Sequence, residues 1–231
     1  MNKNAIISFA NSKGNYINGL ARLSESLRNN SEGIDFISFI GEASLGCELH
    51  INNPYSFKIA AFKKAKEAGY KNILWLDSSC FAIKSVQPIF DKLNESGFVM
   101  QDAGHYLGNW ASDYSLEYFG ISRDEAMSMK CIGNAGLLGL NFDMSHPNIF
   151  FNQWEKSCQD GMFKGTWDNK DKSNGDDERI FGHRHDLSCS SAIIHKMELF
   201  FLAYSGDKIL QYAGVFQETA NDTIIIKAEG L

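Results

Sequence analysis

Proline is scarce in this sequence, since the 231 residues contain only 3. That scarcity excludes a proline-rich linker or a collagen-like segment. Cysteines are few and scattered, and no two of them form a C-x-x-C pair: they are Cys47, Cys80, Cys131, Cys158 and Cys189. This odd-numbered pattern argues against a zinc ribbon or a disulfide scaffold and is typical of a reducing compartment.

Long hydrophobic runs are also missing. No stretch approaches the roughly 18 apolar residues that a membrane-spanning helix needs. The apolar run at residues 5–10 is too short for the core of a signal peptide, and Ser8 interrupts it. We therefore expect a soluble, cytoplasmic protein without stable membrane insertion.

Positive charge is in deficit, with 22 Lys and Arg against 28 Asp and Glu, for a net charge of -6. A broad basic surface for nucleic acid is therefore disfavoured, although a local basic groove is not excluded. Aromatic residues, in contrast, reach 13%, with 17 Phe. That content favours a large core with an aromatic-lined cleft.

Apolar strand-like segments alternate with amphipathic helix-like segments along the first half of the chain. Strands are expected at 5–9, 34–40, 72–77, 97–101, 135–140, 199–202 and 223–227. Helices are expected over 17–27, 87–94, 147–157 and 186–197, with two more opening at Pro54 and in a capping box at Ser122. The pattern predicts one α/β domain over residues 1–231, with a central, mostly parallel (mixed) sheet flanked by helices.

Ligands of such sheets bind outside the carboxyl ends of the strands, so polar residues at those positions are the first candidates. Asp77 follows the nearly all-apolar stretch 72–76. A carboxylate there is costly unless something binds it, and a divalent cation with a diphosphate is one such partner. The alternative is that Asp77 caps the next turn. The residues alone leave both interpretations open.

A second candidate is the run His183-Arg184-His185-Asp186. Two histidines and an aspartate can supply metal ligands or a base, and an arginine can pair with phosphate. The alternative is a helix N-terminus that Asp186 caps, with two exposed histidines. Glycines in the preceding segment, 161–182, indicate a mobile lid beside a site.

Lys58 is predicted one turn into a helix, where the partial positive charge of the N-terminus favours anions. It is therefore either a phosphate contact or a solvated lysine. The small residues around Asn134 allow a ligand to approach the backbone closely, or they serve tight strand packing. Tyr106 and Trp110 either stack on an acceptor sugar or pack in the core.

Several familiar signatures are absent from the sequence. It contains no G-x-x-x-x-G-K-[ST] phosphate loop, and no G-x-G-x-x-G follows the first strand. No G-x-S-x-G elbow occurs either, which argues against a serine hydrolase.

Three segments, in this order, resemble nucleotide-sugar-dependent glycosyltransferases of the GT-A fold, over roughly residues 1–205. Tyr55-Ser56-Phe57-Lys58, with the strand that ends at Asp77, resembles the helix and strand leading into the family's acidic D-x-D element. Asn134-Ala135-Gly136-Leu137-Leu138 resembles its donor-sugar strand. His183-Arg184-His185-Asp186-Leu187-Ser188 resembles the H-R-H-D-Q-S segment of bacterial polysaccharide-type members.

The resemblance implies a Rossmann-like nucleotide-binding half at 1–105 and an acceptor and donor-sugar half at 106–231, which includes loop 161–182. It implies Mn²⁺ or Mg²⁺ as cofactor, held by Asp77, Ser79, His183 and His185. It assigns the nucleotide and donor to Phe9, Ala10, Asn11, Tyr55, Lys58, Asn134, Ala135, Gly136 and Arg184. Asp186 is the expected catalytic residue, as a base or a donor-sugar contact.

Two positions depart from the family pattern. The acidic element reads Asp77-Ser78-Ser79, so its second aspartate is missing, and an enzyme that needs no metal is an alternative. Leu187 stands where the family often has glutamine, so the polar contact of that glutamine is lost.

The implied function is transfer of a sugar from a nucleoside diphosphate sugar, expected to be a UDP-sugar, to a hydroxyl of an acceptor. The expected acceptor is a saccharide. A modified base of a nucleic acid is the alternative acceptor, and no other role for nucleic acid is expected. One alternative is a catalytically degenerate protein that binds nucleotide sugars. The other is a metal-dependent α/β phosphoesterase that uses Asp77, His183 and His185. The stereochemical outcome, retaining or inverting, stays open.

Overall fold

A computed structural model describes residues 3–12, 14–132, 136–199, 208–212 and 224–229. Asn134 and Ala135 of the predicted donor-sugar segment lie outside the described residues, as does most of the strand expected at 199–202. Along the described part, no helix is both long and apolar enough to cross a membrane.

The centre of the fold is a five-stranded sheet in the order β2-β1-β3-β8-β5. Its strands are β1 (Asn4–Ala10), β2 (Asp35–Ile40), β3 (Asn72–Leu76), β5 (Phe98–Val99) and β8 (Leu137–Asn141). The first three run parallel to one another, whereas β8 runs antiparallel to both β3 and β5. The predicted mixed α/β class is therefore confirmed, with the parallel part confined to the N-terminal strands.

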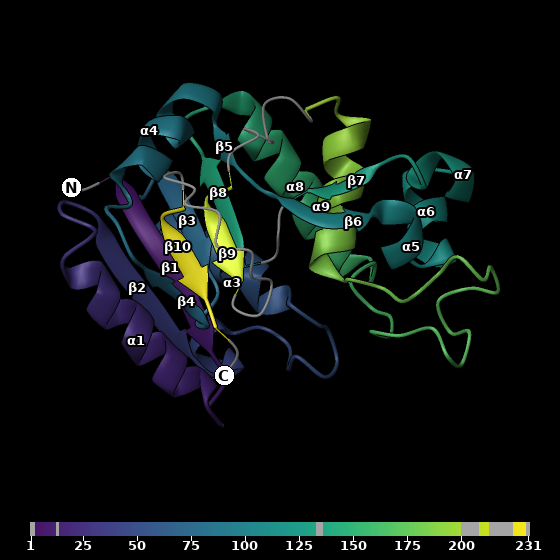
Figure 1. Ribbon diagram of the computed structural model, residues 1–231, viewed down its shortest axis with the longest axis horizontal. Coiled ribbons are helices and arrows are strands. Elements are labelled where there is room, and N and C mark those ends of the chain that lie inside the picture. Colours follow the sequence, from purple (N-terminus) through teal and green to yellow (C-terminus); the bar gives the residue numbers. More distant parts are fainter. Residues whose placement is uncertain (1–2, 13, 133–135, 200–207, 213–223, 230–231) are drawn as a thin grey trace.

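Helices cover both faces of this sheet, and the alternation of side chains along its strands divides the core in two (Figure 1). Ile6 and Leu74 point to one face, and Ile7 and Trp75 point to the other. The first face packs against α1 (Tyr16–Arg28), α4 (Gln87–Ser96) and a small sheet of β4 (Cys80–Ala82), β10 (Ile226–Ala228) and β9 (Leu210–Tyr212). The second face packs against α3 (Ser56–Glu67), α8 (Ser145–Gln159) and α9 (Asp186–Lys196).

A smaller lobe with its own core lies beside the sheet, at the right of Figure 1. It consists of α5 (Leu107–Trp110), α6 (Asp113–Phe119), α7 (Arg123–Ala126) and a ribbon of β6 (Asp102–Tyr106) and β7 (Lys130–Ile132). The predicted capping box is confirmed, since Ser122 and Glu125 exchange side-chain and backbone hydrogen bonds at the start of α7. Helix α9 contributes Cys189 and Ile193 to the main core and Leu187 and Ala192 to this lobe, and so connects the two.

One local prediction needs correction. Helix α3 begins at Ser56 rather than at Pro54, because Tyr55 takes a left-handed backbone conformation with φ of 61°. The two functional halves that meet at residue 105 stay a prediction, and the sheets join them, because β8 and β10, which follow that residue, pair with β3 and β4. The short helix α2 (Glu42–Leu45) was not expected from the sequence.

Candidate active site

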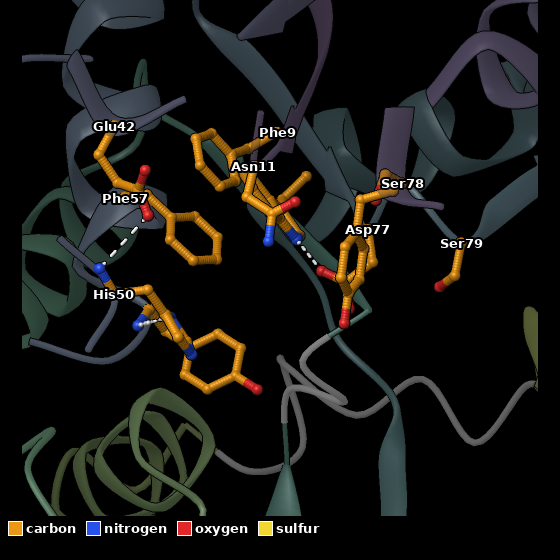
Figure 2. Close-up of a pocket in the computed structure, with 11 residues that line it drawn as sticks. Phe9, Asn11, Glu42, His50, Phe57, Asp77, Ser78 and Ser79 are labelled. Carbon is orange, nitrogen blue, oxygen red and sulfur yellow. Dashed lines mark hydrogen bonds between the residues drawn. The ribbon is translucent and has the colours of Figure 1, made fainter. Parts of the chain in front are cut away.

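A cavity of about 230 Å³ opens at the carboxyl ends of β1 and β3, where ligands of parallel sheets bind (Figure 2). One side is aromatic: the rings of Phe9 and Phe57 stack with centroids 4.3 Å apart, and Tyr55 lies next to Phe57. The opposite side is polar and comes from the segment that follows β3. The lining residues are Phe9, Asn11, Tyr16, Glu42, His50, Tyr55, Phe57, Trp75, Asp77, Ser78 and Ser79.

Beneath this cavity the structure brings one lysine and two aspartates together. Lys58 Nζ lies 2.7 Å from Asp186 Oδ2 and 3.8 Å from Asp77 Oδ1, and the Lys58 side chain is only 1% exposed. The indole Nε1 of Trp75 donates a hydrogen bond to Asp77 Oδ1 at 2.7 Å. Residues 58 and 186 stand 128 positions apart in the chain. A buried ammonium therefore joins the end of β3 to the start of α9.

Asp186 does not cap α9 with its side chain, so the capping interpretation is wrong. The residue is the first of the helix, its carboxylate binds Lys58, and His185 stands in the cap position without a side-chain cap bond. The backbone carbonyl of Asp186 accepts a hydrogen bond from Trp154 Nε1 at 3.1 Å. The side-chain oxygen Asp186 Oδ1 accepts no hydrogen bond from any described residue. One oxygen of this nearly buried carboxylate is therefore left for a ligand.

Asp77 is not a turn cap either. Its backbone carbonyl accepts the Cys80 N–H at 2.9 Å, but its carboxylate is held by Trp75 and Lys58. The side chain keeps 34% of its surface exposed, toward the cavity. The surrounding protein removes enough solvent to raise the pKa of this carboxyl, although the Lys58 charge and the Trp75 hydrogen bond work in the opposite direction.

Tyr55 and His185 are neighbours at the site, and both have a positive φ, of 61° and 49°. Their rings lie 5.5 Å apart. The Tyr55 N–H donates to His50 Nδ1 at 3.2 Å, and His185 Nδ1 bonds to the Phe163 carbonyl at 2.8 Å. Non-glycine residues in this conformation cost about 1–3 kcal/mol each and cluster at functional sites. The strain therefore marks the same place as the buried charges.

Burial also shapes the protonation of the two aromatic neighbours. It raises the pKa of the Tyr55 hydroxyl, with further help from the negative charges of Asp186 and Asp77. It lowers the pKa of His185, whose Nε2 is buried with no hydrogen-bond partner among the described residues. Both groups are thus neutral at physiological pH.

His183 does not fit its predicted role as a metal ligand. Its Nδ1 accepts the Ser112 N–H at 3.1 Å, and its Nε2 bonds to the Met162 carbonyl at 2.9 Å. With the side chain fully buried and both nitrogens engaged, no lone pair is left for a metal. The same geometry removes His183 from the phosphoesterase alternative.

The remaining predicted ligands do not complete a Mn²⁺ or Mg²⁺ site. Asp77 offers only Oδ2, because Trp75 and Lys58 both contact its Oδ1. Ser79 stands where a second carboxylate would serve, and His185 is 2% exposed. Within the described ranges, no three His, Cys, Asp or Glu side chains lie close enough together to hold a metal ion. These residues therefore do not fit a bound divalent cation without further ligands.

Three of the residues predicted to bind the nucleotide and donor lie at the cavity, and a fourth lies next to Asp77. Phe9, Asn11 and Tyr55 line the cavity. Gly136 is buried beside it, and its carbonyl accepts the backbone N–H of Asp77 at 3.1 Å.

Three others do not line it. Ala10 is buried, and its carbonyl accepts the Gly41 N–H at 2.9 Å. Lys58 lies under the cavity with its charge committed to carboxylates, so a direct phosphate contact does not fit its position. Arg184 lies outside the cavity, between two tryptophan rings.

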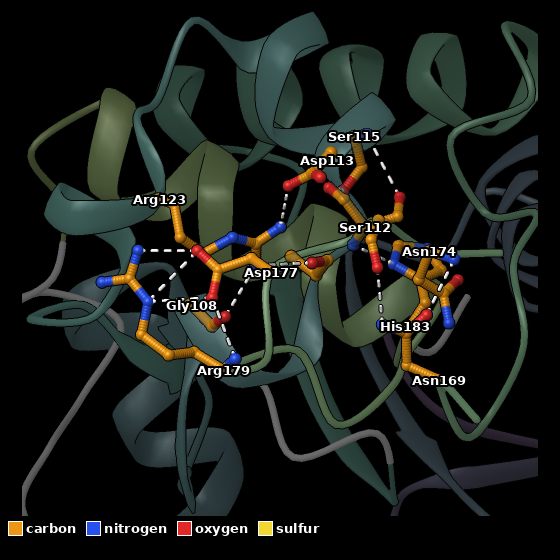
Figure 3. Close-up of polar contacts among 12 residues, drawn as sticks. Gly108, Ser112, Asp113, Ser115, Arg123, Asn169, Asn174, Asp177, Arg179 and His183 are labelled. Carbon is orange, nitrogen blue, oxygen red and sulfur yellow. Dashed lines mark hydrogen bonds and ion pairs between the residues drawn. The ribbon is translucent and has the colours of Figure 1, made fainter. Parts of the chain in front are cut away.

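Polar contacts join loop 161–182 to the smaller lobe (Figure 3), and its role as a mobile lid stays a prediction. Asn174 is buried, donates through Nδ2 to the Thr166 carbonyl at 3.0 Å and accepts the Asp113 N–H at 2.8 Å. Arg179 pairs with Asp177 and with Asp124 of α7, each at 2.7 Å. These contacts join the loop to α6 and α7 of the smaller lobe.

The sequence interpretation assigned no role to six lining residues: Tyr16, Glu42, His50, Phe57, Trp75 and Ser78. Phe57 and Trp75 had a usable signal, because each stands within two positions of a predicted site residue. His50 and Glu42 had none, since their position depends on a hydrogen bond from the His50 N–H to Glu42 Oε1 within an irregular segment.

The sequence matches no protein-family profile and no curated protein. Among solved structures, the chain is similar to galactosyltransferase LgtC in complex with donor and acceptor sugar analogues. The two share 13% identity and a TM-score of 0.49, over 97% of this chain and 86% of that one. The chain is also similar to the apo bifunctional glycosyltransferase WbbM, with 11% identity and a TM-score of 0.53, over 98% of this chain and 45% of that one. The chain thus spans less than half of WbbM and shares the α/β fold of this glycosyltransferase.

Proposed function

We propose that this protein is a glycosyltransferase that uses a nucleoside diphosphate sugar, with a UDP-sugar as the expected donor and a saccharide hydroxyl as the expected acceptor. The observation that carries the proposal is the convergence of Lys58, Asp77 and Asp186 beneath an aromatic-walled cavity at the carboxyl ends of β1 and β3. The likeness of the fold to a glycosyltransferase structure supports it.

The cavity walls match the two ends of such a donor. Phe9 and Tyr55 supply flat apolar surface for a base, and Asn11 supplies an amide for its polar edge. Asp77 and Ser79, at the opposite side, face the ribose and diphosphate part of the ligand. A Mn²⁺ ion at this part of the donor is predicted by the resemblance alone.

In the proposed reaction, an acceptor oxygen forms a bond to the anomeric carbon, and the bond from that carbon to the diphosphate oxygen breaks. The nucleoside diphosphate leaves with the electron pair. We assign the proton of the acceptor hydroxyl to Asp186, whose Oδ1 accepts no hydrogen bond from the described residues. Lys58 is a positioning residue, because it holds the carboxylate through Oδ2 at 2.7 Å.

The test is release of nucleotide from a panel of UDP-sugars, measured with and without Mn²⁺ and with and without saccharide acceptors. We expect binding and slow nucleotide release by the natural protein, and a loss of release of at least 100-fold in Asp186→Asn with donor affinity changed less than threefold. Asp143→Asn is the matched control, because that carboxylate is exposed and makes only long ion pairs of 3.8 Å.

Two outcomes would overturn the proposal. Failure to bind any nucleotide sugar would refute it outright. Binding with no release across the panel would favour the degenerate binding protein instead.

A further inference from the structure

Arg184 occupies an unusual position beside the cavity, between two tryptophans. Its guanidinium carbon lies 3.8 Å from the centroid of the Trp110 ring and 4.3 Å from that of Trp167. Such distances place the cation on the ring faces, where their negative electrostatic potential attracts it. The two rings thus hold the guanidinium in one place.

This cation has no charged partner among the described residues. Three other arginines, Arg22, Arg123 and Arg179, each lie within 3.1 Å of a carboxylate oxygen. Arg184 forms no such pair, and its Nε is buried without a hydrogen-bond partner. In a protein with a net charge of -6, an unpaired guanidinium at the edge of a cleft is suited to a negatively charged ligand.

The backbone holds this arrangement in place. The Arg184 N–H bonds to the Trp110 carbonyl and to Ser188 Oγ, each at 3.0 Å. Ser188 Oγ donates in turn to the same Trp110 carbonyl. The arginine is therefore fixed to α5 before any ligand arrives, which lowers the entropic cost of binding.

Exposed aromatic surface surrounds the guanidinium. Trp167 is 49% exposed and Phe181 is 56% exposed, and Phe181 lies edge-on to Trp110 with centroids 5.8 Å apart. We call Trp110, Trp167, Phe181 and Arg184 the tryptophan–arginine face. A flat apolar ring beside a planar fork of N–H donors fits a sugar ring that carries a carboxylate.

The face adjoins the cavity without forming part of it. Trp167 lies 6.2 Å from Tyr55, which lines the cavity, and 5.3 Å from His185, whose chain neighbour is Asp186. Neither Arg184 nor Trp167 is among the lining residues, whereas Asp77 and Ser79 at the diphosphate side are. An anion on this face would therefore lie next to the cavity but outside its lining, away from the residues assigned to the donor diphosphate.

We propose that the tryptophan–arginine face binds an acidic sugar, such as a uronic acid, of the acceptor glycan. This inference rests on the proposed glycosyltransferase function and adds the chemical class of the acceptor. The guanidinium binds the carboxylate through two parallel hydrogen bonds, and the exposed ring of Trp167 covers the sugar. An acidic acceptor would otherwise be repelled by the acidic protein, so this one cation selects it and places it next to the donor site.

The test uses two probes that differ only in the carboxylate, methyl β-D-glucuronide and methyl β-D-glucoside. Binding is followed by tryptophan emission and by ligand-observed NMR, with UDP titrated in parallel. We expect the natural protein to bind the glucuronide at least tenfold more tightly than the glucoside. Arg184→Met should abolish this preference and change UDP affinity less than twofold, whereas Arg179→Met, a matched change on loop 161–182, should leave both unchanged.

Arg184→Lys covers the case in which the methionine variant does not fold. This variant keeps the positive charge but loses the planar guanidinium with its paired N–H donors. We therefore expect it to retain less than a third of the glucuronide preference. Equal binding of the two probes by the natural protein would overturn the inference. A tenfold loss of UDP affinity in Arg184→Lys would also overturn it, because the arginine would then serve the donor. Absence of UDP binding in the natural protein refutes the proposed function, whereas UDP binding without a glucuronide preference refutes only the acceptor class.

Discussion

The buried ion pair between Lys58 and Asp186 makes a strong prediction for stability. The Lys58 side chain is 1% exposed, and its ammonium lies 2.7 Å from Asp186 Oδ2. Lys58→Met fills nearly the same volume but leaves Asp186 without its cation. Removal of one partner of a buried pair costs about 3–5 kcal/mol, because the other charge stays desolvated. We expect a loss of that size in the free energy of unfolding.

The assay is urea unfolding of a double-mutant cycle of Lys58→Met, Asp186→Leu and both together. Because an apolar pair can replace a buried ion pair with little loss, the double variant should be more stable than Lys58→Met alone. Lys63→Met is the matched control on the same helix. Its ammonium lies 2.6 Å from Glu155, but its side chain is 46% exposed, so its loss should stay at or below about 1 kcal/mol. Equal small losses for Lys58→Met and Lys63→Met would refute the reasoning.

Two further predictions concern titratable groups at the site. Burial lowers the pKa of His183 to about 3, whereas an unfolded histidine titrates near 6.5. Stability from this group is therefore present above pH ~6.5, and up to about 5 kcal/mol of it is lost as the pH falls toward 3. In His183→Asn, the free energy of unfolding should depend less steeply on pH over that range. An unchanged slope of that free energy against pH would contradict this. Because the fold raises the pKa of Asp77 and so disfavours its charged form, Asp77→Asn should not lower the free energy of unfolding by more than about 0.5 kcal/mol. UDP-sugar affinity measured by calorimetry should fall at least tenfold in that variant, and unchanged affinity would place the donor elsewhere.

The alternation of β1, α1, β2, α3, β3 and α4 could be predicted from local patterns, whereas the short elements α2, β4 and those of the smaller lobe before α7 could not. The stretch that ends at Asp77 is nearly all apolar because β3 is buried on both faces. Its direction relative to β8 could not be predicted, since an apolar run has the same composition in parallel and antiparallel pairs. Asp77 was a site candidate because a carboxylate at the end of such a strand needs a partner, and in the structure it lines the cavity.

The partner itself could not be predicted from the sequence. Lys58 and Asp186 are 128 residues apart, and only the packing of α3 against the sheet and of α9 beside it brings them to 2.7 Å. The four consecutive residues at 183–186 also have side chains in different environments, which the sequence does not reveal. His183 is a fully bonded core residue, Arg184 stacks between tryptophans, and Asp186 faces the lysine. Adjacent residues in a run of charges point in different directions once the backbone turns, here at His185.

A crystal structure of the protein soaked with UDP and Mn²⁺ tests the central claim most directly. The account predicts the uracil ring against Phe9 and Tyr55, and the diphosphate within hydrogen-bond distance of the segment Asp77–Ser79. A nucleotide bound at any other surface, or an empty cavity at a saturating concentration of UDP, would contradict it.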